Sequence, residues 1–117
     1  SGRTIVYTDE YSGTGGGPCE SPFVVERGDQ YYLFIGPDWD RLMKRRAETG
    51  RLSWAGYRGT RVLESDDPLR FEVSNQVGFL DSHASEVIMD EAGSAWVSHC
   101  GWNQGGVYLA PLRWEAE

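Results

Sequence analysis

The sequence predicts an all-β fold in which two four-stranded antiparallel units, of the type that forms propeller blades, pack together. Three observations lead to this prediction: the composition, an internal repeat, and turn residues between short apolar runs. The 117 residues include five tryptophans, six tyrosines and fifteen glycines. Aromatic residues are enriched in strands, whereas long helices favour Ala, Leu, Glu and Lys.

Length and composition fit a single globular domain spanning 1–117. Hydrophobic residues make up 39% of the chain and charged residues 25%, close to the average for globular proteins. The formal net charge of −7 would repel phosphate backbones, and the short basic cluster at 41–46 does not define a nucleic-acid face. Neither a membrane-spanning apolar run nor a signal-peptide pattern is visible. We therefore expect a soluble, cytoplasmic protein that binds neither nucleic acid nor membrane.

An internal repeat is the clearest sign of organisation along the chain. Residues 21–28, followed by 31–34, recur as residues 85–92, followed by 95–98, at an offset of 64 throughout. Each copy reads as an apolar run, a glycine-bearing or acidic turn, and an aromatic run, which is typical of an antiparallel hairpin. Each copy therefore opens one β-sheet.

The two units predicted from these hairpins are unequal. The first blade, 18–75, gains strands at 59–64 and 71–73, separated by a turn that contains a proline. The second blade, 82–115, gains one further run at 106–114 and is one strand short.

Two segments lie outside this pattern. The β-rich segment 4–8 has no hairpin partner of its own and can supply the strand that the second blade lacks. The segment 38–54 breaks the strand pattern and is interpreted as an insertion loop, with one helical turn as the alternative.

Closed propellers have about four to eight blades, so two blades cannot close a ring. Because exposed sheet edges and faces favour association, we expect a homo-oligomer, with strand exchange through residues 4–8 as one route.

One motif carries a resemblance to a known family. The string Cys19-Glu20-Ser21-Pro22-Phe23-Val24-Val25, leading into Tyr31-Tyr32-Leu33-Phe34, resembles the general-acid motif of glycoside hydrolase families 32 and 43, the furanosidase superfamily. These enzymes are five-bladed β-propellers. Later segments look like further blades of that superfamily: 61–68, 82–88 and 108–114. The resemblance spans about residues 18 to 114 and implies a partial, roughly two-blade relative.

The resemblance implies that Glu20 is the general acid that protonates the leaving sugar oxygen. Glycoside hydrolysis also needs a second carboxylate, at roughly 5–5.5 Å for retention or 6.5–9.5 Å for inversion. The family takes it from its first blade, and Asp9 and Glu10 do not match that motif. We therefore expect the isolated chain to bind carbohydrate without hydrolysing it. A glutamate at the start of a strand can also be a solvated edge residue or a turn acceptor.

The candidate substrate-binding residues are His83, Glu86, Trp102 and Asn103. The resemblance places His83 in the central channel of some members, where it helps to hold a water or a cation. Trp102 lies with Asn103 in a glycine-rich loop, where a ring beside amides suits a sugar. Imidazole and carboxylate also suit divalent metals, but His83, His99 and Glu86 lack tight ligand spacing, so we predict structural histidines and no metal.

Three hypotheses for function remain open. In the first, a split relative of a glycosidase propeller keeps a sugar-binding groove around Glu20, His83 and Trp102. In the second, several copies form a closed ring that is active as a glycosidase. In the third, the chain is a structural or interaction protein that retains only the fold. No cofactor is predicted, because the glycine tract 13–17 lacks the Lys-Ser/Thr ending of a phosphate loop. Cys19 and Cys100 are interpreted as reduced thiols.

Overall fold

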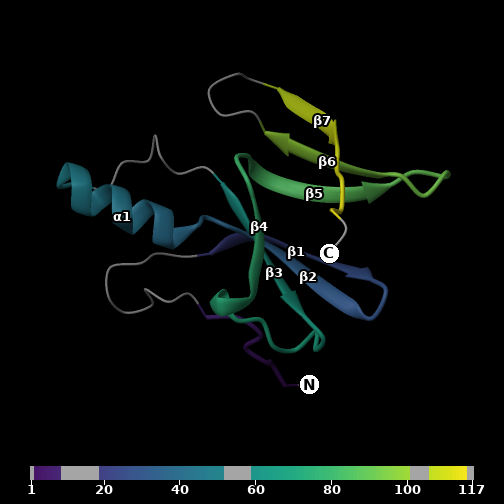
Figure 1. Cartoon of the computed structure of the whole chain (residues 1–117), viewed down its shortest axis with the longest axis horizontal. Coiled ribbons are helices and arrows are strands. Elements are labelled where there is room, and N and C mark those ends of the chain that lie inside the picture. The colour runs from purple at the N-terminus through teal and green to yellow at the C-terminus, as the bar shows by residue number, and fades with distance from the viewer. Residues whose placement is uncertain (1, 9–18, 52–58, 101–105, 116–117) are drawn as a thin grey trace.

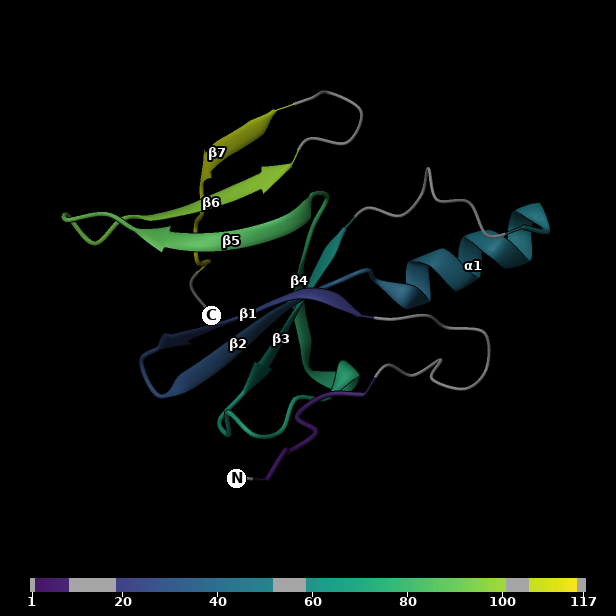
Figure 2. The same ribbon diagram turned by 180° about the vertical axis from the view of Figure 1, so that it is seen from behind.

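The computed structural model of the chain describes residues 2–8, 19–51, 59–100 and 106–115, and these form two antiparallel sheets and one helix (Figures 1 and 2). The strands are β1 (Glu20–Arg27), β2 (Gln30–Gly36), β3 (Thr60–Ser65), β4 (Gln76–Leu80), β5 (His83–Met89), β6 (Ala95–Cys100) and β7 (Val107–Pro111). Sheet A has the order β1-β2-β3-β4, and sheet B has the order β5-β6-β7. The mostly β architecture with two antiparallel sheets is confirmed, but the second sheet has three strands and lacks the fourth that the prediction of two four-stranded units required.

The two sheets pack together through one face of sheet A. On that face Tyr32, Phe34 and Val62 are buried and form a core with Val87 of sheet B. The chain then leaves β7 and crosses this face, so that the ring of Trp114 lies 4.8 Å from that of Tyr32. Burial of these apolar side chains is the main favourable term that joins the sheets.

The N-terminal segment covers the other face of sheet A. Residues 4–8 are not a strand: the Val6 carbonyl accepts a hydrogen bond from the Phe71 backbone N–H at 2.7 Å. Val6, Tyr7 and Phe71 pack on the buried Leu33 and Leu63. The prediction that this segment completes the second sheet is therefore wrong within one chain, because its apolar side chains cover the first sheet.

The fourth strand of sheet A lies later than predicted. Residues 71–73 form no strand; instead a 3-10 turn, η2 (Val73–Asn75), leads into β4. Phe71 is 4% exposed and is used as a core side chain, which takes this part of the chain off the sheet plane. Sheet A consequently extends to Leu80, beyond the boundary predicted at 75.

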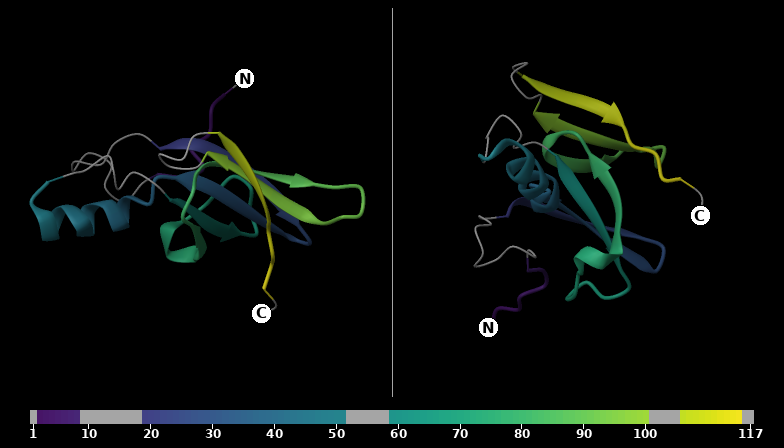
Figure 3. Two further views of the ribbon diagram at one scale, coloured as in Figure 1. Left: turned by 90° about the horizontal axis from the view of Figure 1, so that it is seen from above. Right: turned by 60° about the vertical axis from the view of Figure 1, so that its left-hand side comes forward.

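The predicted insertion loop contains a regular helix, α1 (Trp39–Thr49), longer than the single turn considered as an alternative. Asp38 caps its N-terminus by accepting a hydrogen bond from the Arg41 backbone N–H at 3.2 Å, and Gly50 ends it in the left-handed conformation at φ 79°. Two buried side chains anchor its first turn: Trp39 and Leu42. The rest of the helix projects away from the sheets (Figures 1 and 3). Residues 52–54 lie outside the described residues.

Both hairpins contain the repeat, but the first strands of the two copies align one residue differently from the alignment that the sequence predicted. The matching pairs are Glu20 with Gly36 and Phe23 with Phe34 in β1–β2, and His83 with Cys100 and Glu86 with Ser98 in β5–β6. These pairs give an offset of 63 in the first strand and 64 in the second. The constant offset of 64 is therefore wrong, because the turn of the second hairpin is one residue longer.

Asp90 holds that longer turn in place. Its carboxylate accepts hydrogen bonds from the Trp96 indole N–H at 3.0 Å, from the Ser94 backbone N–H at 2.8 Å and from the Ala92 backbone N–H at 3.0 Å. These bonds favour the ionised form, and the Trp96 bond contributes most to lowering the Asp90 pKa from its usual value.

Candidate functional site

Two β-bulges occupy equivalent positions at the starts of β1 and β5. The register shifts between Glu20 and Phe23 in one hairpin and between His83 and Glu86 in the other. Both bulges contain a non-glycine residue in the left-handed region, Ser21 at φ 57° and Ala84 at φ 54°. Such a conformation costs on the order of 1–3 kcal/mol and is found preferentially at functional sites. Bulges also re-aim neighbouring side chains.

Both bulges lie on one edge of the molecule. β1 and β5 run in the same direction (Figure 1). Gly36, the partner of Glu20, approaches Gly59 so closely that an added Cβ would lie 3.2 Å from the Gly59 carbonyl oxygen. The Gly59 backbone N–H in turn donates to the Ser82 carbonyl at 3.2 Å, next to His83. We call this region the bulge edge and define it by Glu20, Ser21, His83 and Ala84.

Buried hydroxyl groups fix the start of β5 against β3. The Thr60 hydroxyl donates to the Ser82 carbonyl at 3.0 Å, and the Ser82 and Ser85 hydroxyl oxygens lie 2.7 Å apart. Thr60 and Ser85 are each 3% exposed. Because these bonds hold the residues on both sides of His83 and Ala84, they position the second bulge relative to sheet A.

The structure brings together some of the predicted site residues and separates another. Glu20 is exposed at the start of β1, and His83 begins β5, so both belong to the bulge edge. Glu86 is exposed and, by strand alternation with the buried Val87, lies on the face of sheet B that points away from sheet A. Trp102 and Asn103 lie outside the described residues.

One carboxylate near the bulge edge was missed in the sequence analysis. Asp81 is exposed in the turn between β4 and β5, two residues before His83. Only the close approach of β3 and β5 brings this turn to the same edge as Glu20. The sequence signal was the run Asp81-Ser82-His83 just before the repeated hairpin.

A buried ion pair was also missed, and it lies beneath the other face of sheet A. The Arg61 guanidinium approaches an Asp38 carboxylate oxygen at 3.2 Å, and both side chains are almost fully buried. Arg61 also donates to the Gln76 amide oxygen at 3.1 Å and to the Tyr7 hydroxyl at 3.2 Å. These partners satisfy the buried charges, so the network ties the N-terminal segment, the α1 cap, β3 and β4 together.

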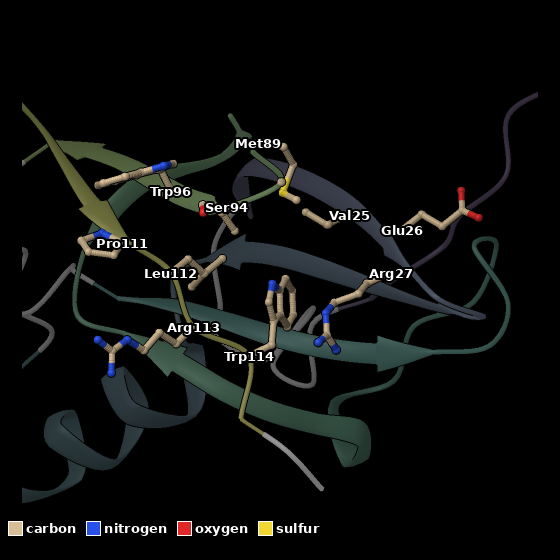
Figure 4. Close-up of a pocket in the computed structure, with 12 residues that line it drawn as sticks. Val25, Glu26, Arg27, Met89, Ser94, Trp96, Pro111, Leu112, Arg113 and Trp114 are labelled. Atoms are coloured by element: carbon tan, nitrogen blue, oxygen red, sulfur yellow. The ribbon is translucent and has the colours of Figure 1, made fainter. Parts of the chain in front are cut away.

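The pocket in Figure 4 lies between the sheets, near the β1–β2 turn. It has a volume of about 530 Å³, and its walls include Val25, Met89 and Leu112. The Arg27 guanidinium lies 5.0 Å from the centre of the Trp114 ring beside it. This pocket is at the opposite end of β1 from Glu20, so it is not the predicted groove around Glu20, His83 and Trp102.

The remaining histidine packs on an aromatic ring, and the two cysteines are free thiols. The His99 ring stacks on that of Tyr108, with centroids 5.6 Å apart. Cys19 is half-buried, Cys100 is exposed, and both are free thiols. Within the described ranges, no three His, Cys, Asp or Glu side chains gather in a way that could hold a metal ion. No helix in those ranges is long and apolar enough to span a membrane.

Comparisons with protein-family models, with curated proteins and with solved structures give no match for this chain. The resemblance to glycoside hydrolase families 32 and 43 therefore depends on the sequence motifs alone.

Proposed function

We propose that this chain binds carbohydrate at the bulge edge, where Glu20 and His83 lie at the starts of their strands, with Trp102 and Asn103 as further contacts. The observation that carries the proposal is the pair of equivalent bulges, each of which places a left-handed non-glycine residue directly after one of these two groups. Strain at two equivalent positions on one edge is the pattern expected of a site that fixes side-chain direction.

The chemistry of the two side chains supports a sugar as the ligand. A carboxylate accepts hydrogen bonds from hydroxyl groups, and a neutral imidazole both donates and accepts them. Carbohydrates present many hydroxyl groups next to apolar ring faces, which aromatic side chains such as Trp102 cover. The overall charge of −7 disfavours phosphorylated or other anionic sugars, so neutral glycosides fit best.

The proposal includes the interpretation of sheets A and B as neighbouring propeller-type blades. The first strands of the two sheets, β1 and β5, contact one another and run in the same direction. In a propeller the first strands of the blades surround the central channel, and the bulge edge would then border that channel.

Binding is tested by titrating neutral furanosides and pyranosides, selected on a glycan array, into the chain by calorimetry. Glu20→Gln removes the charge but keeps the size, and a hydrogen bond to a charged group contributes about 1.5–3 kcal/mol. We therefore expect about tenfold to a hundredfold weaker binding for this variant. Glu26→Gln is the matched control, because Glu26 is exposed on the same strand near its other end. Failure of the wild type to bind any sugar, or equal affinity of both variants, would contradict the proposal.

A glycosidase activity is the second candidate, because Asp81 adds an exposed carboxylate to the neighbourhood of the bulge edge. Glycoside hydrolysis requires two carboxyl groups, one acting as the acid. The test is hydrolysis of an aryl furanoside by the wild type. Loss of this hydrolysis in both Glu20→Gln and Asp81→Asn, with retention in Glu26→Gln, would establish the activity.

A further inference from the structure

The pocket between the sheets has apolar walls that remain open to water (Figure 4). Its volume of about 530 Å³ falls within the roughly 300–1,000 Å³ that is typical of small-molecule sites. Val25, Ala95 and Leu112 line it and are only partly buried, and Met89 is 58% exposed. A ligand that covers these walls removes their apolar surface from water, which favours binding.

One cation, Arg27, stands beside these walls. Its guanidinium lies 5.0 Å from the centre of the Trp114 ring. Two other charged residues line the pocket, Glu26 and Arg113, and Figure 4 shows their charged groups directed away from Arg27. The pocket therefore presents one positive charge next to an aromatic and aliphatic surface.

Arg27 forms no ion pair within the described ranges, although the chain holds 18 acidic and 11 basic residues. The ion pairs of those ranges involve other cations: Arg41, Lys44, Arg61 and Arg70. The neighbouring acid, Glu26, lies on the opposite face of β1 by strand alternation. A guanidinium presents N–H donors in a fork that matches the two oxygens of a carboxylate. The missing partner of Arg27 is therefore best supplied by a ligand carboxylate.

We propose that this pocket binds a small apolar acid, whose carboxylate pairs with Arg27 and whose apolar body lies against Met89, Leu112 and Trp114. The formal charge of −7 repels anions at long range, but physiological salt screens charges beyond about 8 Å, so the adjacent guanidinium governs selectivity. The site lies at the opposite end of β1 from Glu20 and goes beyond the carbohydrate site. For a ligand of about ten non-hydrogen atoms, we expect a dissociation constant on the order of 0.1–1 mM.

Nuclear magnetic resonance titration of the full, isotope-labelled chain tests the proposal with two matched probes, cinnamate and its neutral analogue cinnamyl alcohol. Both should shift the Trp114 indole N–H signal, which is identified by its absence in Trp114→Phe. Cinnamate should bind about twofold to fivefold more tightly than the alcohol, because a solvent-exposed ion pair contributes modestly.

Two pairs of variants locate the charge and the wall. Arg27→Met should abolish the preference for cinnamate over the alcohol, whereas Arg70→Met, which removes an equal charge outside the pocket, should keep it. Met89→Glu should weaken cinnamate binding at least about threefold, because it replaces part of the apolar wall with a like charge. Ile88→Glu is its control: it adds the same charge at a residue that is 47% exposed and faces the other side of β5. Circular dichroism establishes that each variant is folded.

Three results would overturn the proposal. The first is a wild type whose Trp114 indole signal does not move with cinnamate up to about 5 mM, well above the expected dissociation constant. The second is equal binding of cinnamate and cinnamyl alcohol to the wild type. The third is a loss of cinnamate affinity in Ile88→Glu as large as that in Met89→Glu. Glu20→Gln should leave cinnamate binding unchanged, so failure of this proposal and failure of the carbohydrate proposal are distinguishable.

Discussion

Removing the Arg61 guanidinium should destabilise this protein more than any surface charge change. In Arg61→Met, the Asp38 carboxylate loses its buried cationic partner, and the Gln76 and Tyr7 side chains lose a donor. Breaking a buried pair typically costs about 3–5 kcal/mol. Asp38 keeps the bond from the Arg41 backbone N–H and an Arg41 guanidinium at 3.5 Å, so the lower end, about 3 kcal/mol, is expected.

Urea unfolding followed by circular dichroism measures this loss. Arg70→Met is the matched control, because Arg70 pairs with Glu72 at 2.6 Å on the surface, where its side chain is 75% exposed. Exposed pairs contribute less than about 1 kcal/mol. The double variant Asp38→Asn with Arg61→Met should lose at least about 1 kcal/mol less than the sum of the single losses, because it leaves no unpaired charge. Equal losses for Arg61→Met and Arg70→Met would refute the reasoning.

Two further predictions concern the hairpins. Because the Asp90 pKa is lowered in the folded state, its contribution is fully present above its usual pKa of about 3.9 and is lost as the pH falls. The difference in unfolding free energy between wild type and Asp90→Asn should therefore be constant near neutral pH and shrink below about pH 4; a constant difference down to pH 2 would be the contrary result. Ala84→Gly should stabilise the chain by about 1 kcal/mol, because it relieves the left-handed φ of 54°. Ala110→Gly, at an ordinary strand position, should destabilise it by about 0.5–1 kcal/mol, and thermal melts that show the same sign for both would contradict the assignment of strain.

Local pattern was sufficient for the two hairpins, but not for the fourth strand of sheet A, which was predicted at 71–73 and lies at β4 (Gln76–Leu80). The hairpin of β5 and β6 was predicted because apolar runs flank an acidic turn, and β6 (Ala95–Cys100) contains the predicted run 95–98. The helix was missed because only Trp39 and Leu42 of α1 are buried, so the apolar periodicity that reveals most helices is short. Its caps, Asp38 and Gly50, were visible signals that the sequence analysis did not use.

The candidate site was predicted only in part. Glu20 and His83 were selected by motif, and the structure places both at one edge, but nothing in the chain order relates Asp81 to Glu20. The bulges were equally hidden, because neither Ser21 nor Ala84 is a residue type that normally marks a left-handed conformation. The one-residue difference between the turns also concealed that Glu20 corresponds to His83 and not to Ala84.

By itself the sequence determined the β class and the duplicated hairpin, because alternation and turn chemistry act over neighbouring residues. The tertiary structure decided where the N-terminal segment lies, which faces of the sheets meet, and that Asp38 and Arg61 form a buried pair. These contacts join residues far apart in the chain, and they depend on which apolar surface is left uncovered once each sheet has formed. Local residue pattern does not show which of these apolar surfaces will cover one another.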